Sequence, residues 1–595
     1  DEKAIQVLRE EIEKRTGVVL RRTNTIPSAT TPFIAVGRRA ELRRLDPTLD
    51  CGPETGEHFR PEGFSIVVQK QSRAMAVIAG ADGRGVLYGV GRFLRQAELA
   101  PSRIAVPADW RLQTAPKFEM RGHQLGYRPK VNAYDAWSPE QFDQYIRELA
   151  LFGTNSIEIL PPRTDDERTS RHMKLPPMEM MVRLSEIIES YGMDVWIWYP
   201  NMGKDYVGAA AIQAELTERE EIFGRLKRID HILVPGGDPG NLHPDVLFPW
   251  LERMAVPLKQ HHPRAKIWVS PQAFAPTRAW LDSFYRHVNR TPTWLGGVTF
   301  APWAKTPLPE MRAIVDATIK IRNYPDITHS VECQYPVPNW DLAFALTLHR
   351  ECYNPRPMAM KVIHNRFADF TCGTVTYTEG INDDFNKFVW SDQDWDPATP
   401  VIDTVRDYCR LFINPGLANE LADGVFALER NWEGALAVNR QVDVTLRNWQ
   451  DMERRLGEIA RTNYRFQMGL LRANYDAYVK ARLIHETWLE ASAREALRLA
   501  PQTGSIVAME RAENTLGQAQ TAPVAQAHKA KCDELADRLF AEIGSQLTVK
   551  RHGAQSRTRG AFMDGIDEPL NDVAWLRAQF KEVRALDRED ARLRK

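Results

Sequence analysis

The feature that most constrains the fold is a series of short apolar runs between residues 117 and 396. Each run is rich in β-branched or aromatic residues, ends in polar or turn-forming residues, and is followed by a stretch long enough for a helix. Eight segments fit: 120–128, 154–162, 193–201, 231–238, 265–272, 295–303, 326–336 and 372–380. Eight strand–helix units of this length are what a closed (β/α)8 barrel requires. The pattern predicts an α/β fold centred on a TIM barrel over residues 117–396.

The segment before the barrel, residues 1–116, has its own α/β pattern. Apolar residues recur at helical spacing over residues 4–20, and a glycine-containing turn leads into a second helical pattern over 82–96. Short apolar runs typical of strands lie between them, at 32–37, 63–69 and 75–80. We therefore expect a small N-terminal α/β domain.

The segment after the barrel, residues 397–595, lacks strand patterns. Residues 448–500 show helical spacing with mixed charges, which is typical of a helical bundle, and the aromatic residues along them fit its core. We expect a C-terminal helical domain, which could shape the pocket or form a homodimer interface.

Composition excludes several classes of function. The chain has 78 basic and 78 acidic side chains, so a nucleic acid is not an expected partner. No apolar stretch is long enough for a membrane span, and the six cysteines are scattered, which favours free thiols over disulfides or a metal site. No motif for a nucleotide or other cofactor is found, so we expect neither metal nor cofactor. The first residue, Asp1, is not Met; this fits a processed periplasmic or secreted protein, with the cytoplasm as the alternative.

Carboxyl groups at the strand ends indicate a chemistry. Hydrolysis of a glycosidic bond needs one carboxyl group that protonates the leaving oxygen and a second that acts as nucleophile or base. Asp238 ends the fourth expected strand and Glu332 lies in the seventh, on the opposite side of the ring, so both could face one pocket. Glu379, after the eighth strand, is the second choice for the proton donor. The alternative for Asp238 is a turn cap, and for Glu332 a structural salt bridge.

Other polar and aromatic residues near the strand ends are candidates for binding a sugar. Aromatic rings stack on the C–H faces of sugars, and amides, hydroxyls and charged groups bind their hydroxyls. Helix-to-barrel packing is the alternative for at least half of the aromatic residues. The candidates for substrate binding are Arg121, His123, Tyr127, Glu158, Tyr199, Asn201, Gln272, Trp303, Gln334 and Tyr377.

Four stretches of the sequence make the chain resemble known glycosidases. The N-terminal stretches EEIEKRTGV and DGRGVLYGVGRFLRQ look like the small domain that precedes the barrel in family 20 β-N-acetylhexosaminidases and in family 67 and 115 α-glucuronidases. KFEMRGHQLGYR is similar to the first-strand motif of the hexosaminidases, in which an Arg holds sugar hydroxyls, and this implies that role for Arg121. HILVPGGDPG resembles their Gly-Gly-Asp-Glu, in which the Asp orients the acetamido group and the Glu is the general acid.

The resemblance departs from the family pattern at one position. Asp238 matches the Asp of the motif, but Pro239 occupies the place of the acid, so another strand end has to supply the proton. The resemblance implies a glycoside hydrolase that acts on the terminal N-acetylhexosamine-type sugar of a glycan. The alternatives are an α-glucuronidase-like enzyme, with Arg121, Arg128, Lys130 or Arg163 binding a uronic acid, and a carbohydrate-binding pseudoenzyme.

Overall fold

The computed structural model describes residues 1–28, 30–52, 60–70, 73–239 and 242–595. Its first part is a four-stranded mixed sheet in the order β1-β3-β2-β6, in which β1 and β3 are parallel and the other pairs antiparallel. The apolar face of α3 packs against β1, β2 and β3. The elements of this part are α1 (Glu2–Thr16), β1 (Phe33–Arg38), α2 (Arg39–Leu45), β2 (Phe64–Lys70), β3 (Ala74–Gly80), α3 (Gly83–Gln96), β4 (Glu98–Ala100), β5 (Arg103–Ala105) and β6 (Arg111–Thr114).

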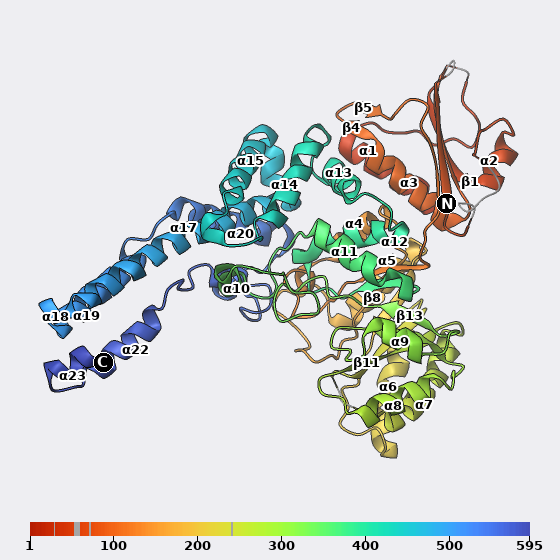
Figure 1. The fold of residues 1–595 in the computed structure, drawn as a ribbon. Coiled ribbons are helices and arrows are strands. Elements are labelled where there is room, and N and C mark those ends of the chain that lie inside the picture. The colour runs from red at the N-terminus through yellow and green to blue at the C-terminus, as the bar shows by residue number, and fades with distance from the viewer. Residues whose placement is uncertain (29, 53–59, 71–72, 240–241) are drawn as a thin grey trace. The chain divides into compact units, whose positions relative to one another are not determined.

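Eight parallel strands then close into a barrel, which confirms the predicted TIM barrel fold (Figure 1). The strands are β7 (Met120–Gln124), β8 (Ser156–Ile159), β9 (Asp194–Trp198), β10 (His231–Gly237), β11 (Lys266–Ala273), β12 (Leu295–Phe300), β13 (Lys320–Asn323) and β14 (Gly373–Thr376). The main helices between and after them are α4 (Pro139–Ala150), α5 (Pro177–Ser190), α6 (Ala209–Arg225), α7 (Pro244–His261), α8 (Arg278–Val288), α9 (Leu308–Ile314), α11 (Pro357–Phe367) and α12 (Asp384–Trp395).

The interior of the barrel is a packed core with a buried charge pair. Trp196, Trp198 and Trp268 meet in one hydrophobic cluster, because alternate residues of each strand face inward. Arg322 lies among them, and its Nη1 donates to Oε2 of Glu158 at 2.7 Å with both side chains fully buried. Pairing is what permits two charges inside an apolar barrel.

The seventh strand is not where the sequence pattern predicted it. The strand is β13, and residues 326–336 follow it as a loop in which only Asp326 forms a bridge, to Tyr377. The loop bends at its start because the backbone N–H groups of Thr328 and His329 both donate to Oδ1 of Asp326 at 3.1 Å. An apolar pattern does not identify β13, because this strand carries Lys320 and Arg322. Arg322 is paired with Glu158 only once the barrel has closed.

The chain divides into two compact units. The first comprises residues 1–335 and 354–422, and it includes the N-terminal sheet, the barrel and α13 (Val401–Phe412). The second comprises residues 336–353 and 423–595. These two units have other borders than the predicted domains, and the division into residues 1–116, 117–396 and 397–595 stays a prediction.

The second unit is helical. Its longest helix, α17 (Tyr464–Arg498), packs against α15 (Gln441–Leu456), α19 (Ser505–Thr521) and α20 (Gln526–Ile543). The short α10 (Leu342–Leu348) also packs on α17, where Tyr475 donates a hydrogen bond to the carbonyl of Thr347 at 2.9 Å. The remaining helices of this region are α14 (Ala418–Arg430), which crosses the border between the units, α16 (Glu458–Thr462), α18 (Ala500–Thr503), α21 (Val549–His552), α22 (Val573–Arg584) and α23 (Glu589–Arg594).

Two expectations from composition can be compared with the described part of the chain. The six cysteines carry thiols rather than disulfides, and Cys51, Cys352, Cys409 and Cys532 are buried. No helix in the described ranges is long and apolar enough to cross a membrane.

Candidate active site at the carboxyl ends of the barrel strands

Charged side chains from four strand ends gather at the carboxyl end of the barrel. Asp238 directly follows β10, is partly buried, and accepts a hydrogen bond from Nε2 of Gln272 at 2.7 Å. Asp165, on the loop after β8, accepts a hydrogen bond from Nζ of Lys130 at 2.7 Å. The charges of Asp165 and Lys130 both act on Asp238, so the three groups are electrostatic neighbours.

The environments of the two aspartates push their pKa values in opposite directions. Burial raises the pKa of Asp238, and the negative charge of Asp165 adds to this; the Gln272 hydrogen bond and Lys130 oppose it only in part. Burial would also raise the pKa of Asp165, but the positive charges of Arg128 and Lys130 outweigh it and leave that pKa lowered. Asp238 is therefore the group that holds a proton more readily, and Asp165 the group that stays ionised.

Arg128 connects this pair to the end of the eighth strand. Its Nη2 donates to Oε1 of Glu379 at 2.9 Å and its Nη1 to Oδ1 of Asp165 at 3.2 Å. Tyr377 donates its hydroxyl to the same oxygen of Glu379. The guanidinium also lies 5.7 Å from the ring centre of Trp198. Arg128 thus holds carboxylates from two loops at the mouth of the barrel.

Several predicted residues lie in or beside this cluster. Asp238, Gln272, Tyr377 and Glu379 belong to it, through the contacts given above. Gln334 accepts a hydrogen bond from the backbone N–H of Asp326 at 3.0 Å, so it supports the loop after β13.

Glu332 is not placed as the sequence predicted. It lies on the loop after β13 and is exposed, with a positive φ of 49°, whereas a carboxyl group at a strand end was expected. The carboxyl group that follows β13 closely is Asp326, which is buried and accepts a hydrogen bond from Nδ1 of His329 at 2.8 Å. The expected pairing of Asp238 with a carboxyl group on the seventh strand fails because residues 326–336 are a loop.

Arg121 does not lie at the predicted sugar site, because it is at the opposite, amino end of the barrel. It is fully buried, and its Nε and Nη1 donate to the carbonyls of Gly153 at 2.7 Å and Phe118 at 2.8 Å. Its Nη2 donates to Oε2 of Glu62, in the N-terminal domain, at 2.5 Å. Every nitrogen of the guanidinium is engaged there, so the sugar-binding role expected for Arg121 does not hold.

Five more candidates form hydrogen bonds within the barrel framework and do not belong to the cluster at its mouth. Their polar groups are taken up by strands, helices or backbone: His123 by the hydroxyls of Thr376 and Ser391, Tyr127 by the backbone at 174–175, Tyr199 by Glu218, Asn201 by the indole of Trp250, and Glu158 by Arg322. All five are buried. Position near a strand end did not reveal which way each side chain points.

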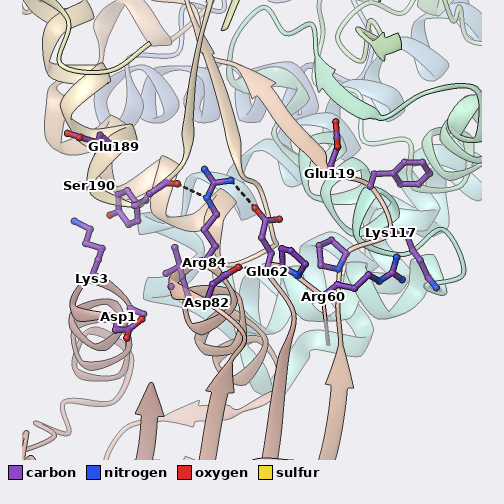
Figure 2. Close-up of a pocket in the computed structure, with 18 residues that line it drawn as sticks. Asp1, Lys3, Arg60, Glu62, Asp82, Arg84, Lys117, Glu119, Glu189 and Ser190 are labelled. Atoms are coloured by element: carbon purple, nitrogen blue, oxygen red, sulfur yellow. Dashed lines mark hydrogen bonds and ion pairs between the residues drawn. The ribbon is translucent and has the colours of Figure 1, made fainter. Parts of the chain in front are cut away.

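A charged crevice of about 880 Å³ also lies at the amino end of the barrel (Figure 2). Figure 2 shows Arg84 and Glu62 side by side in its lining, where the two form an ion pair of 2.8 Å. Arg84 also pairs with Asp194 at 2.6 Å. In TIM barrels this end contributes to stability and the opposite end carries the chemistry, so we assign the crevice a structural role.

Sequence reasoning missed two important members of the cluster as site residues. Asp165 lies six residues beyond β8, within PPRTDDERTS, and no periodicity marks it. The sequence suggests Arg128 only as a partner for a uronic acid. The one available signal was that both lie in loops that follow barrel strands, which is where such folds carry function. Among the described residues, no group of three or more His, Cys, Asp or Glu side chains could hold a metal ion.

The fold and the acidic cluster together define a TIM-barrel protein with a polar site at its strand ends. No protein-family model and no curated protein matches the sequence. Among solved structures, "Structure of CpGH84B" is similar with a TM-score of 0.52 at 11% identity, covering 96% of this chain and 95% of that chain. "Structure of CpGH84D" gives a TM-score of 0.49 at 12% identity, covering 96% and 94%. Both are structures of family 84 glycoside hydrolases. At this identity, the likeness to CpGH84B shows the fold.

Proposed function

We propose that this protein is a glycoside hydrolase that removes a terminal N-acetylhexosamine-type sugar from a glycan. Asp238 is the proton donor and Asp165 is the carboxylate partner. The observation that carries the proposal is the opposite shift of the two pKa values at neighbouring positions, because such a divergence separates an acid from a base in one site. The fold shared with the glycoside hydrolase CpGH84B supports the same class of reaction.

The charges at the mouth favour a neutral sugar over a uronic acid. A uronic acid needs a cation for its carboxylate. Arg128 pairs with Glu379 and Asp165, Lys130 pairs with Asp165, and Arg121 lies at the other end. The last of the four candidates, Arg163, is also engaged, by the carboxylates of Glu215 and Glu218. Each cation therefore already has a carboxylate partner inside the protein.

In the proposed reaction the two aspartates have different roles, one as acid and one as base. Protonated Asp238 donates its proton to the glycosidic oxygen as the bond to the leaving sugar breaks. Ionised Asp165 stabilises the positive charge that develops on the sugar ring and accepts the proton of the attacking water. Gln272 holds the Asp238 carboxyl group, and Arg128 holds Asp165, so both groups are positioned before the substrate arrives.

The test is hydrolysis of two N-acetylhexosaminides that differ in their need for an acid. A dinitrophenyl glycoside has a leaving group that departs without protonation, whereas a natural disaccharide needs the acid. Asp238→Asn should lower kcat/KM on the disaccharide by about 10²–10⁴-fold and affect the dinitrophenyl substrate much less. Asp165→Asn should lower both. Asp282→Asn, at an exposed position of α8, is the matched control and should change neither.

The pH profile of kcat/KM provides a second readout. Activity should fall as the pH rises through the raised pKa of Asp238, which must be protonated, and as it falls through the lowered pKa of Asp165, which must be ionised. The alkaline limb should disappear in Asp238→Asn. Unchanged turnover in that variant would exclude Asp238 as the acid. Sugar binding without any hydrolysis would favour a pseudoenzyme, for which Pro239 in place of the acid is the supporting observation.

A further inference from the structure

Two exposed aromatic side chains lie beside the Asp238–Gln272 pair. Phe274 follows β11 by one residue and Asp238 follows β10 by one residue, and the preceding residues, Gly237 and Ala273, are paired in register. Trp303 belongs to the segment after β12, where its neighbour Ala304 forms an isolated bridge with Gln272. Strand pairing therefore brings the backbone of both residues close to the backbone of Asp238 and Gln272.

These rings face solvent together. Phe274 is 62% exposed and Trp303 is 43% exposed, and their ring centres are 5.8 Å apart with the planes tilted by 49°. Scattered apolar residues on a surface are ordinary, but two adjoining aromatic rings next to a polar site are typical of a ligand surface. The backbone of Trp303 has a φ of 68°, a conformation that costs energy in a bulky residue.

A cationic group completes this surface. Nζ of Lys305 lies 5.3 Å from the ring centre of Trp303. It can donate hydrogen bonds to hydroxyl or acetamido oxygens of a ring that lies on the indole. Apolar faces with one polar donor are the combination that a pyranose ring requires, because its C–H groups stack while its rim carries oxygens.

We propose that Phe274 and Trp303 form the subsite for the second sugar, the one released when Asp238 protonates the glycosidic oxygen. This inference rests on the proposed function and extends it: the preferred substrate is an oligosaccharide whose penultimate residue is itself a sugar ring, rather than a terminal sugar on a protein side chain or a small alcohol. The position beside Asp238 carries the assignment, since the leaving sugar has to lie next to the group that protonates its oxygen.

The first test measures binding without turnover. In the Asp238→Asn background, calorimetry would compare methyl N-acetylglucosaminide with N,N′-diacetylchitobiose and with disaccharides in which N-acetylglucosamine or N-acetylgalactosamine is linked to galactose. Trp303→Ala and Phe274→Ala should each weaken binding of a disaccharide about tenfold and leave the methyl glycoside within about twofold. Trp303→Phe should retain most of the affinity, because it keeps an aromatic face.

A matched control separates the subsite from a general loss of an exposed ring. Trp488→Ala removes a tryptophan that is 59% exposed in the helical unit, and it should leave disaccharide binding unchanged. Equal affinity of Asp238→Asn with and without Trp303→Ala for every disaccharide would overturn the subsite, and so would an Asp238→Asn protein that binds none of them.

The two proposals fail in different experiments. Hydrolysis of a dinitrophenyl N-acetylhexosaminide requires no second sugar, so its absence would count against the proposed function alone. A disaccharide affinity that depends on Trp303 in a protein without hydrolysis would support the subsite and exclude the enzyme. Conversely, hydrolysis of disaccharides with a kcat/KM that is unchanged in Trp303→Ala would support the enzyme and overturn the subsite.

Discussion

At the scale of single residues, the surrounding groups determine the pKa of each carboxyl group. Asp238 and Asp165 are the same residue type at the mouth of one barrel, yet burial dominates the pKa of the first and two cations dominate the pKa of the second. Sequence position predicted Asp238, because it ends an apolar run. It could not predict Asp165, since a loop aspartate acquires its partners only when distant loops meet.

The structural role of Arg121 can be tested by replacing it. Arg121→Met removes a fully buried cation from Glu62 and from two carbonyls, and it should lower the free energy of unfolding by about 3 kcal/mol. KM for sugar substrates should not change, because the side chain lies at the other end of the barrel. Urea unfolding and steady-state kinetics check the two statements.

The matched control for that variant is an exposed arginine. Arg278→Met, in which the side chain is 86% exposed beside Asp282, should change stability by less than about 1 kcal/mol. A raised KM with unchanged stability in Arg121→Met would contradict the structural role and restore the sugar-binding role that the hexosaminidase-like motif implied.

At the scale of elements, the strands had different signals in the sequence. Seven of the eight predicted segments overlap a barrel strand, and most of these strands are the apolar runs expected of buried parallel strands. The exception, β13, reads as Lys-Ile-Arg-Asn, and its Arg322 is tolerated inside the barrel because Glu158 of β8 neutralises it. Because the sequence does not show that Glu158 pairs with Arg322, a charged residue at this position argues against a buried strand.

The packing of the barrel can be tested by replacing a glycine in β12. Gly297 lies against Trp268, and an added Cβ would meet the indole at 2.3 Å and the carbonyl of Lys320 at 2.5 Å. Gly297→Ala should therefore destabilise the barrel by about 2 kcal/mol or more, measured by thermal unfolding. Gly517→Ala, in α19 with no atom within 4 Å of the new Cβ, is the control and should be neutral or slightly stabilising. Equal melting temperatures for both variants would contradict this account of the packing.

At the scale of the whole molecule, the compact units do not follow chain order. Residues 336–353 are inserted between β13 and β14, but they belong to the helical unit. Phe344 and Leu348 of α10 are fully buried, and the helix packs against α17. Trp340 similarly contacts Trp432, with ring centres 4.7 Å apart. A cut after residue 422 would therefore remove the partners of this insertion.

Truncation tests this organisation. A fragment of residues 1–422 should expose the apolar face of α10, bind a hydrophobic dye and aggregate. The same fragment with residues 336–353 replaced by a Gly/Ser linker of equal length should remain soluble and unfold in one cooperative transition. If both fragments behave alike, the insertion does not depend on the helical unit for its packing.

The sequence by itself determined the class of fold, seven of the eight barrel strands and the place of Asp238 after the fourth. These follow from local patterns: apolar runs of strand length, helical spacing between them, and a carboxyl group after a buried run. Only the tertiary structure decided that Asp165 lies beside Asp238, that Arg121 binds the N-terminal domain, and that Glu332 lies on an exposed loop. Each of these depends on contacts between segments that are far apart in the chain, and closure of the barrel sets those contacts, as it also sets the pKa values at its mouth.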